Sequence, residues 1–221
     1  MDFSSSPYLL KEASVRRVMT QVCLALVPGI VAYVILVSPA ILVQLALASI
    51  AALCAEAIML KLRNKPLAMF LGDGSVIVTA WLIALTFPPL APWWFVIVGT
   101  CFAVIVAKHL YGGLGQNPFN PAMVAFAVCI VSFPALMAQW PAHGLELSLF
   151  DQANIVFGFA PRVDALTAAT PLDALKTALH QGDSGSISVA ELLQNQKTYG
   201  MFAGRGWEWI ALAYAFGGAY L

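Results

Sequence analysis

Long apolar runs alternate with short charged segments along this chain. One run without a charge extends from Arg17 to Glu56, and a second extends from Asp73 to Lys108. A bilayer core of about 30 Å is crossed by roughly 20 helical residues, so each run is long enough for two membrane helices. Turn-forming residues divide both runs: Ser38-Pro39 in the first, and several prolines before Trp93-Trp94 in the second.

A third run without a charge, from Lys108 to Glu146, leaves room for only one crossing. It opens with Tyr111–Pro121, a segment too rich in glycine, asparagine and proline for a helix interior. The pattern therefore predicts five membrane helices, at residues 18–37, 41–60, 74–87, 93–107 and 121–138.

More polar sequence follows at 139–206 and is expected to lie outside the membrane. The next apolar run, 207–221, is too short to span a bilayer comfortably and ends while still apolar, so we expect the start of a further transmembrane helix that is cut short. The predicted fold class is all-α: a polytopic transmembrane helix bundle of about six helices with one extracytoplasmic segment.

Composition supports lipid as the solvent. Hydrophobic residues make up 61% of the chain, charged residues 10%, and the mean hydropathy is +0.83. A soluble domain carries about 25% charged and about 45–50% apolar residues. Eleven basic and eleven acidic residues give a net charge of zero, which excludes a global basic field for nucleic acid.

Basic residues favour the cytoplasmic side of short loops and set the expected orientation. The N-terminal arm 1–17 and every second connection carry them, whereas the turns at Ser38-Pro39 and Pro88–Pro92 carry none. This places the arm in the cytoplasm and 139–206 on the far side. The arm is too polar, and the run after it too long, for a signal peptide. The basic markers are Lys11, Arg16, Arg17, Lys61, Arg63, Lys65 and Lys108.

Cysteine and histidine placement predicts no metal site. The cysteines lie singly in apolar helices, which excludes a disulfide framework and CxxC spacing and favours a packing role. The three histidines, His109, His143 and His180, are assigned to loops on both sides of the membrane. The cysteines are Cys23, Cys54, Cys101 and Cys129.

Two acidic residues lie within or beside predicted membrane helices. We expect Asp73 or Ser75 to cap the helix that follows, and a role for Asp73 in binding a ligand or in an ion path is the alternative. Glu56 lies shortly before Lys61, and we expect it to reach the membrane surface and pair there. Proton conduction is the alternative for Glu56.

Asn120-Pro121 predicts a helix start, with asparagine as the cap and proline in the first helical position. The free N–H groups of such a start can hold a phosphate or another anion, and capping alone explains the pair equally well. Gly113-Leu114-Gly115 lacks the third glycine of a dinucleotide fingerprint, and no G-x-x-x-x-G-K-[ST] loop occurs.

The external segment carries hydroxyl groups at Thr167 and Thr170. On the residues alone, a short alanine-rich helix ends near Thr170, because Pro171 disfavours a helical conformation before it, and Thr170 caps the next helix. No nucleophile triad, paired carboxylate or phosphate loop stands near. The residues thus indicate a polytopic membrane protein with one hydroxyl-bearing external loop.

Three stretches of the chain carry a family resemblance, at Ser5–Tyr8, Tyr111–Met123 and Asp164–Pro171. They resemble the D subunit of the Rnf (also called Rsx) ion-translocating electron-transport complex, a family similar to the B subunit of the sodium-pumping NADH:quinone reductase. Pro88–Trp94 and Gly204–Trp207 support the match, which covers nearly the whole chain.

The resemblance implies a covalent flavin in the external segment. In that family a flavin transferase attaches FMN through its phosphate to a threonine in a pattern like D-x-x-[ST]-[GA]-A-T. Asp164 matches the leading acid, Thr167 and Ala168 the two variable positions, and Thr170 the acceptor. Ala168 stands where many members have glycine. The flavin would supply the redox chemistry and the protein would tune it.

The resemblance further implies a subunit of an ion-translocating oxidoreductase in the bacterial inner membrane. It would carry electrons through FMN between ferredoxin and NAD, coupled to Na⁺ or H⁺ movement, with a second, non-covalent flavin as an option. Implied partners are the A, B, C, E and G subunits of Rnf, the flavin transferase and the lipid bilayer.

Family members are longer than this chain. They carry a second, related set of helices, in an arrangement like that of urea-transporter folds, and this chain corresponds to about one set. Two alternatives stay open: a solute channel or transporter of similar helical fold, and a purely structural membrane subunit.

Overall fold

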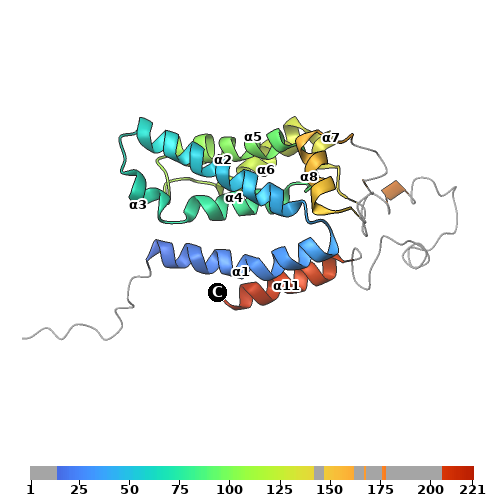
Figure 1. Cartoon of the computed structure of the whole chain (residues 1–221). Helices are drawn as coiled ribbons and strands as arrows, with labels where there is room; N and C mark the ends of the chain where they lie inside the picture. Colours follow the sequence, from blue (N-terminus) through green and yellow to red (C-terminus); the bar gives the residue numbers. More distant parts are fainter. Residues whose placement is uncertain (1–13, 142–146, 162–166, 168–175, 178–205) are drawn as a thin grey trace, which may run out of the picture.

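The computed structural model describes residues 14–141, 147–161, 167, 176–177 and 206–221, and it is helical throughout these ranges apart from turns, short connections and one isolated bridge between Pro141 and Thr167. Helices α1 to α8 follow one another along the chain, and α11 follows residue 206 (Figure 1). Their bounds are Val15–Leu36 (α1), Ile41–Leu62 (α2), Leu67–Leu71 (α3), Ser75–Thr86 (α4), Trp93–Phe102 (α5), Ala103–His109 (η1, a π-helical continuation of α5), Pro121–Ser132 (α6), Pro134–Met137 (α7), Leu149–Phe157 (α8) and Trp207–Ala219 (α11).

Two of the described helices, α1 and α2, are long and apolar enough to cross a membrane. Each has 22 residues and a mean hydropathy of 2.1, and at 1.5 Å per residue each is about 33 Å long. Three shorter apolar helices lie at Ser75–Thr86, Trp93–His109 and Pro121–Ser132. Each predicted range therefore contains a helix, with starts at Ile41, Trp93 and Pro121 as expected, but among the described helices only α1 and α2 have the length expected for a crossing.

The helix predicted at 121–138 is broken, which corrects that expectation. Helix α6 ends at Ser132, and α7 starts at Pro134. The intervening Phe133 has φ −134° and ψ 54°, outside the helical region, because a proline disfavours the helical conformation of the residue before it. The start of α6 is as predicted: Asn120 accepts a hydrogen bond from the Ala122 N–H at 2.9 Å.

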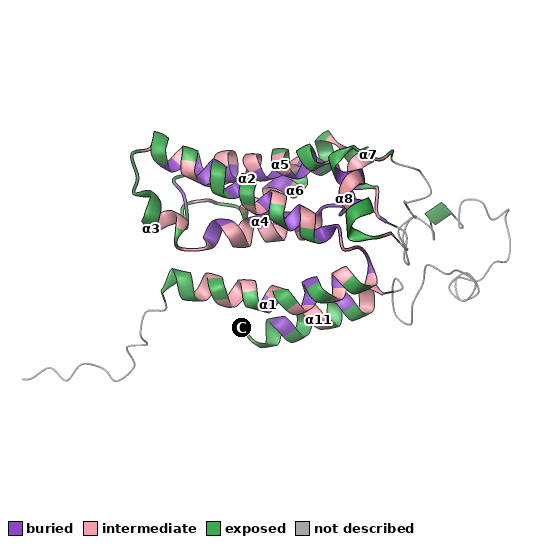
Figure 2. Cartoon of the chain, viewed as in Figure 1, coloured by how far each residue is buried: buried purple, intermediate pink, exposed green. Residues whose placement is uncertain are grey.

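Nine alanines stand among the buried residues of the described core, which lies mainly between α2, α4, α5, η1 and α6. Small side chains let helix backbones approach closely, which is how membrane helices pack. Figure 2 shows the buried positions facing inward and exposed ones facing outward. The exposed positions include large apolar side chains such as Ile35 and Val131, 75% and 80% exposed, as expected for a lipid-facing surface. The buried core includes Ala48, Ala52, Ala55, Val76, Ala80, Ala84, Phe87, Phe95 and Val104.

Helices α1 and α11 pack against each other as a separate layer beside the bundle (Figure 1). Two glycines make this close approach possible. A Cβ atom at Gly217 would overlap the backbone carbonyl of Ala25, and one at Gly29 would overlap the ring of Tyr214. Near the start of α11, Trp207 packs edge-to-face against Tyr33 of α1, with ring centroids 5.8 Å apart.

At the end of the bundle away from α3, two buried glutamines tie the turns together. Gln44 donates to the carbonyls of Pro89 and Ala91, at 3.1 and 2.7 Å, and so fixes the proline-rich turn before α5. Gln152 of α8 accepts from the Ser38 hydroxyl at 2.6 Å and from the Ala40 N–H at 3.2 Å. Helix α8 is therefore anchored on the turn between α1 and α2.

A candidate functional site: buried charges between three helices

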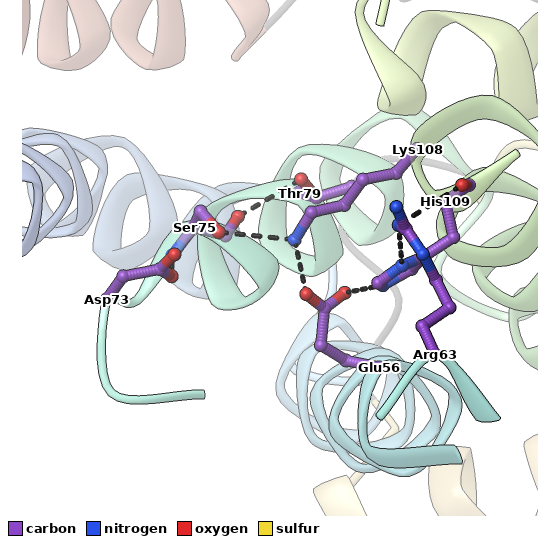
Figure 3. A network of polar contacts seen from close by, with 7 residues as sticks. All are labelled: Glu56, Arg63, Asp73, Ser75, Thr79, Lys108 and His109. Carbon is purple, nitrogen blue, oxygen red and sulfur yellow. Dashed lines mark hydrogen bonds and ion pairs between the residues drawn. The ribbon is translucent and has the colours of Figure 1, made fainter. Parts of the chain in front are cut away.

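A cluster of ionisable side chains is buried between α2, η1 and the start of α4 (Figure 3). Glu56, Lys108 and His109 are only 1%, 3% and 4% exposed. The Lys108 ammonium donates to Oε1 of Glu56 at 2.8 Å, and Nε2 of His109 lies 3.0 Å from Oε2 of the same carboxylate. One carboxylate is thus held between two nitrogen groups.

The chain brings these residues together by running α2 and α5–η1 in the same direction through the bundle. Glu56 follows Ile41, where α2 starts, at the same spacing at which Lys108 follows Trp93, where α5 starts. The wider π-helical turn of η1, with an i→i+5 bond from the Leu110 N–H to the Ile105 carbonyl, lets the adjacent Lys108 and His109 both point inward.

The start of α4 closes the cluster on one side. Lys108 also donates to the Ser75 hydroxyl at 3.2 Å. The Ser75 N–H donates to Oδ1 of Asp73 at 2.7 Å, and the Thr79 hydroxyl donates to the Ser75 carbonyl at 3.1 Å. Asp73 therefore satisfies the first free N–H of α4 from the position before the N-cap, which is Gly74, and Ser75 is a helical residue that contacts Lys108.

Arg63, at the end of α2, closes the other side. Its Nη1 donates to Nδ1 of His109 at 3.2 Å and to the His109 carbonyl at 3.3 Å. A guanidinium has donors only, so Nδ1 must accept and the ring proton sits on Nε2, facing Glu56. The N–H is not aligned with Oε2, so this contact is electrostatic rather than a well-formed hydrogen bond.

The cluster corrects three sequence predictions. Glu56 does not reach the surface to pair with Lys61; it is buried and pairs with Lys108, because it faces η1 inside the bundle. Lys108 is not a loop marker of the cytoplasmic side, since its ammonium is enclosed. His109 is not a loop residue either, since it ends η1 and is buried.

The sequence contained a signal for this cluster. Glu56 and Lys108 have equal spacing from two helix starts that follow turns on the same side, so the two charges lie at equal depth on α2 and η1. Equal depth of opposite charges in apolar helices favours their pairing. Arg63 and Ser75 carry no comparable signal, because their roles depend on how the helix ends pack.

The cluster does not suit a resident metal ion. In the described ranges, no group of three or more His, Cys, Asp or Glu side chains is placed to hold a metal. The ammonium of Lys108 already lies where a cation would contact Glu56. What the arrangement can do chemically is hold, exchange or orient protons.

Of the segment predicted to carry the flavin, Asp164 to Thr170, the structure describes Thr167 alone, which lies at the other end of the bundle. Asp164, Ala168 and Thr170 lie outside the described residues. Thr167 is exposed and forms the bridge with Pro141, just beyond α7. At the same end, a cleft of about 280 Å³ separates α5 from α8 and is lined by Pro92, Trp93, Trp94, Ile155, Val156, Phe157, Gly158 and Ala160.

Comparison with known proteins confirms the family resemblance. Residues 2–221 match the model of the NQR2, RnfD, RnfE family. The D subunit of the ion-translocating oxidoreductase complex from Escherichia fergusonii is 44% identical over 99% of this chain. Its counterpart from Escherichia coli O7:K1 is 43% identical over 99%. The chain spans 65% of the length of these relatives. It therefore belongs to the NQR2, RnfD, RnfE family.

Proposed function

We propose that this chain is part of the membrane-embedded D subunit of an Rnf complex, which couples electron flow between ferredoxin and NAD to movement of Na⁺ or H⁺. The observation that carries this proposal is the 44% identity across 99% of the chain to the D subunit of an ion-translocating oxidoreductase complex. The long apolar helices support a membrane subunit, and the ion pair buried inside the bundle supports a role in moving ions or protons.

The electrons would pass through FMN attached by its phosphate to Thr170, within the motif that begins at Asp164. The described part of this motif fits a tether, because Thr167 is exposed at the end of the bundle. Trp93, Trp94 and Phe157 line the cleft at this end and offer flat apolar surfaces. FMN supplies the one- and two-electron chemistry when it is bound; the threonine hydroxyl only anchors it.

The membrane topology and the partners of the subunit are part of the same proposal. The arm 1–17 lies in the cytoplasm, 139–206 in the periplasm, and 18–138 and 207–221 in the inner membrane. The helices form one of two related sets, as in urea-transporter folds. Partners are the A, B, C, E and G subunits and the flavin transferase, and a second flavin would be bound non-covalently.

In-gel flavin fluorescence of the denatured subunit tests the attachment. The full-length subunit, expressed with the transferase, is expected to fluoresce, and Thr170→Ala is expected to abolish the signal. Thr177→Ala, on a nearby described and exposed residue, is the matched control and should keep it. The tryptic peptide 163–176 should carry the mass of FMN less one water.

Each outcome separates the alternatives. Fluorescence that survives Thr170→Ala would place the flavin elsewhere. An unmodified peptide from cells that contain the transferase would remove the flavoprotein assignment and leave the structural subunit or the solute channel, which predict no covalent flavin.

A further inference from the structure

We propose that Glu56 and His109 form a buried proton-exchange site that opens toward Arg63, and that Lys108 keeps metal cations out of it. The purpose of such a site, transfer of the coupled ion, rests on the proposed function. Its chemistry rests only on the geometry of the cluster (Figure 3).

The atoms around Glu56 favour a proton over a metal cation. A hard cation needs several oxygen ligands, about six to eight for Ca²⁺. The described cluster offers the two carboxylate oxygens and the Ser75 hydroxyl, against nitrogen groups from Lys108 and His109. Lys108 donates to both the carboxylate and this hydroxyl, so a positive charge already occupies the place of the cation.

Two unsatisfied atoms face each other inside the cluster. Oε2 of Glu56 and Nε2 of His109 have no aligned hydrogen-bond partner, although they lie 3.0 Å apart. Buried polar atoms without a partner are uncommon and need an explanation. At 3.0 Å the two atoms are close enough to pass a proton once the imidazole turns to align its N–H with Oε2, and that turn would also satisfy both atoms.

Proton uptake balances without any further reactant. A hydronium ion gives its proton to Nδ1 of His109 and leaves as water. The N–H bond at Nε2 breaks with its electron pair kept by the ring, and the proton released from Nε2 forms an O–H bond at Oε2 of Glu56. The imidazole is neutral before and after, with its proton moved from Nε2 to Nδ1. Glu56 becomes a carboxylic acid, and the reverse steps release the proton.

Arg63 controls this exchange because it occupies Nδ1. A guanidinium in a protein does not give up its proton, so a docked Arg63 blocks the entry point. Arg63 is half-buried and is followed by the exposed Asn64 and Lys65, so its departure would open His109 to water.

The charges that act on the pair come from three elements. They are Arg63 after α2, Lys108 on η1 and Asp73 before α4, while α3 and α6 carry no charged residue. Uptake of one proton leaves the ammonium of Lys108 without its anion. A negative charge arriving in the complex, such as a transferred electron, would favour uptake.

Infrared difference spectra between high and low pH test the site without turnover. The sample is the complex with its full-length subunit, reconstituted in lipid. We expect acidification to produce a carboxylic acid C=O band that is absent in Glu56→Gln. The matched control Thr100→Val, which alters a fully buried hydroxyl on α5 outside the cluster, should keep the band.

Two further variants test the route of the proton through His109 and Arg63. They remain informative even if the Glu56→Gln variant does not fold. We expect His109→Gln to slow hydrogen–deuterium exchange of the band at least tenfold, because the relay is lost. Arg63→Gln should accelerate it several-fold, because Nδ1 is open. Unchanged rates in both variants, or a normal band in Glu56→Gln, would overturn the proposal.

A separate measurement tests whether Na⁺ competes with the proton at this site. Replacing choline chloride with sodium chloride should leave the pH midpoint of the band unchanged. A midpoint that moves to lower pH as Na⁺ rises would show competition and overturn the exclusion of metal cations. In-gel flavin fluorescence of the same samples separates the proposals: flavin without the band refutes this inference alone, and the band without flavin refutes the flavin assignment alone.

Discussion

At the residue scale, the main energetic feature is a full ion pair placed among alanines and valines. Removing two charges from water costs several kcal/mol per ion, and the attraction between Glu56 and Lys108 offsets this only while both partners stay in place. The hydroxyl of Ser75 adds a second acceptor for the same ammonium. The pair therefore depends on α2, α4 and η1 at once.

Substituting Lys108→Met is expected to destabilise the protein by about 3–5 kcal/mol, because it leaves the buried Glu56 carboxylate unpaired. Thermal unfolding of the purified complex in detergent measures the loss. The double variant Glu56→Gln, Lys108→Met removes both charges and should recover most of the stability. If the Lys108→Met variant were as stable as the unsubstituted protein, the ion pair would not contribute to the stability of the fold.

At the element scale, the close packing of α1 against α11 depends on the position of glycine residues. Gly217 lets α11 approach the carbonyl of Ala25, whereas the neighbouring Gly218 faces open space. Both lie in the same helix, so they share backbone context and differ in what surrounds them. The pairing of α1 with α11 therefore rests on one face of α11.

Gly217→Ala is expected to lower the thermal unfolding midpoint, because the added methyl group overlaps the backbone of α1. Gly218→Ala is the matched control and should be neutral or stabilising, since alanine is favoured over glycine in a helix by about 1 kcal/mol. Equal effects of the two changes would contradict the described packing.

The sequence predicted the helices better than their details. Charge-free runs and prolines place the starts at Ile41, Trp93 and Pro121, because burial in lipid and turn chemistry are local properties. The break at Phe133 was also readable, since Pro134 follows it. The π turn of η1 was not, because no residue in it marks an i→i+5 pattern.

The candidate site was only partly predictable. Glu56 and Asp73 were identified as unusual acids, and Asp73 does accept from the first N–H of α4, although Gly74 holds the N-cap position. The partner of Glu56 was wrong, because proximity along the chain favoured Lys61, whereas the partner on η1 lies 52 residues away in sequence. Such contacts depend on helix packing, which periodicity alone does not define.

At the scale of the whole molecule, the two candidate features lie at opposite ends. The charged cluster is near α3, and the bridge of Thr167 to Pro141 is at the end that carries α7 and α8 (Figure 1). If α2 crosses the membrane once, these ends face different compartments. A flavin at one end and proton exchange at the other would then act across the thickness of the bilayer.

Cysteine labelling in cells tests this orientation. Phe150→Cys, on α8 and 74% exposed, should react with a membrane-impermeant thiol reagent once the outer membrane is permeable. Met69→Cys, on α3 and 72% exposed, should react only after the inner membrane is lysed. The unsubstituted chain measures the background of its native cysteines, and the reverse pattern would invert the orientation.

The pairing of α1 with α11 has a consequence for biosynthesis. Most of the chain lies between Leu36 and Trp207, so the ribosome completes α1 long before its partner. At a synthesis rate of about 5–20 residues per second, roughly 10–35 s pass between the synthesis of Gly29 and that of Tyr214, which packs against it. During that interval lipid or the insertion machinery must shield this helix face, so a delay in translation would prolong the time for which α1 lacks its partner helix.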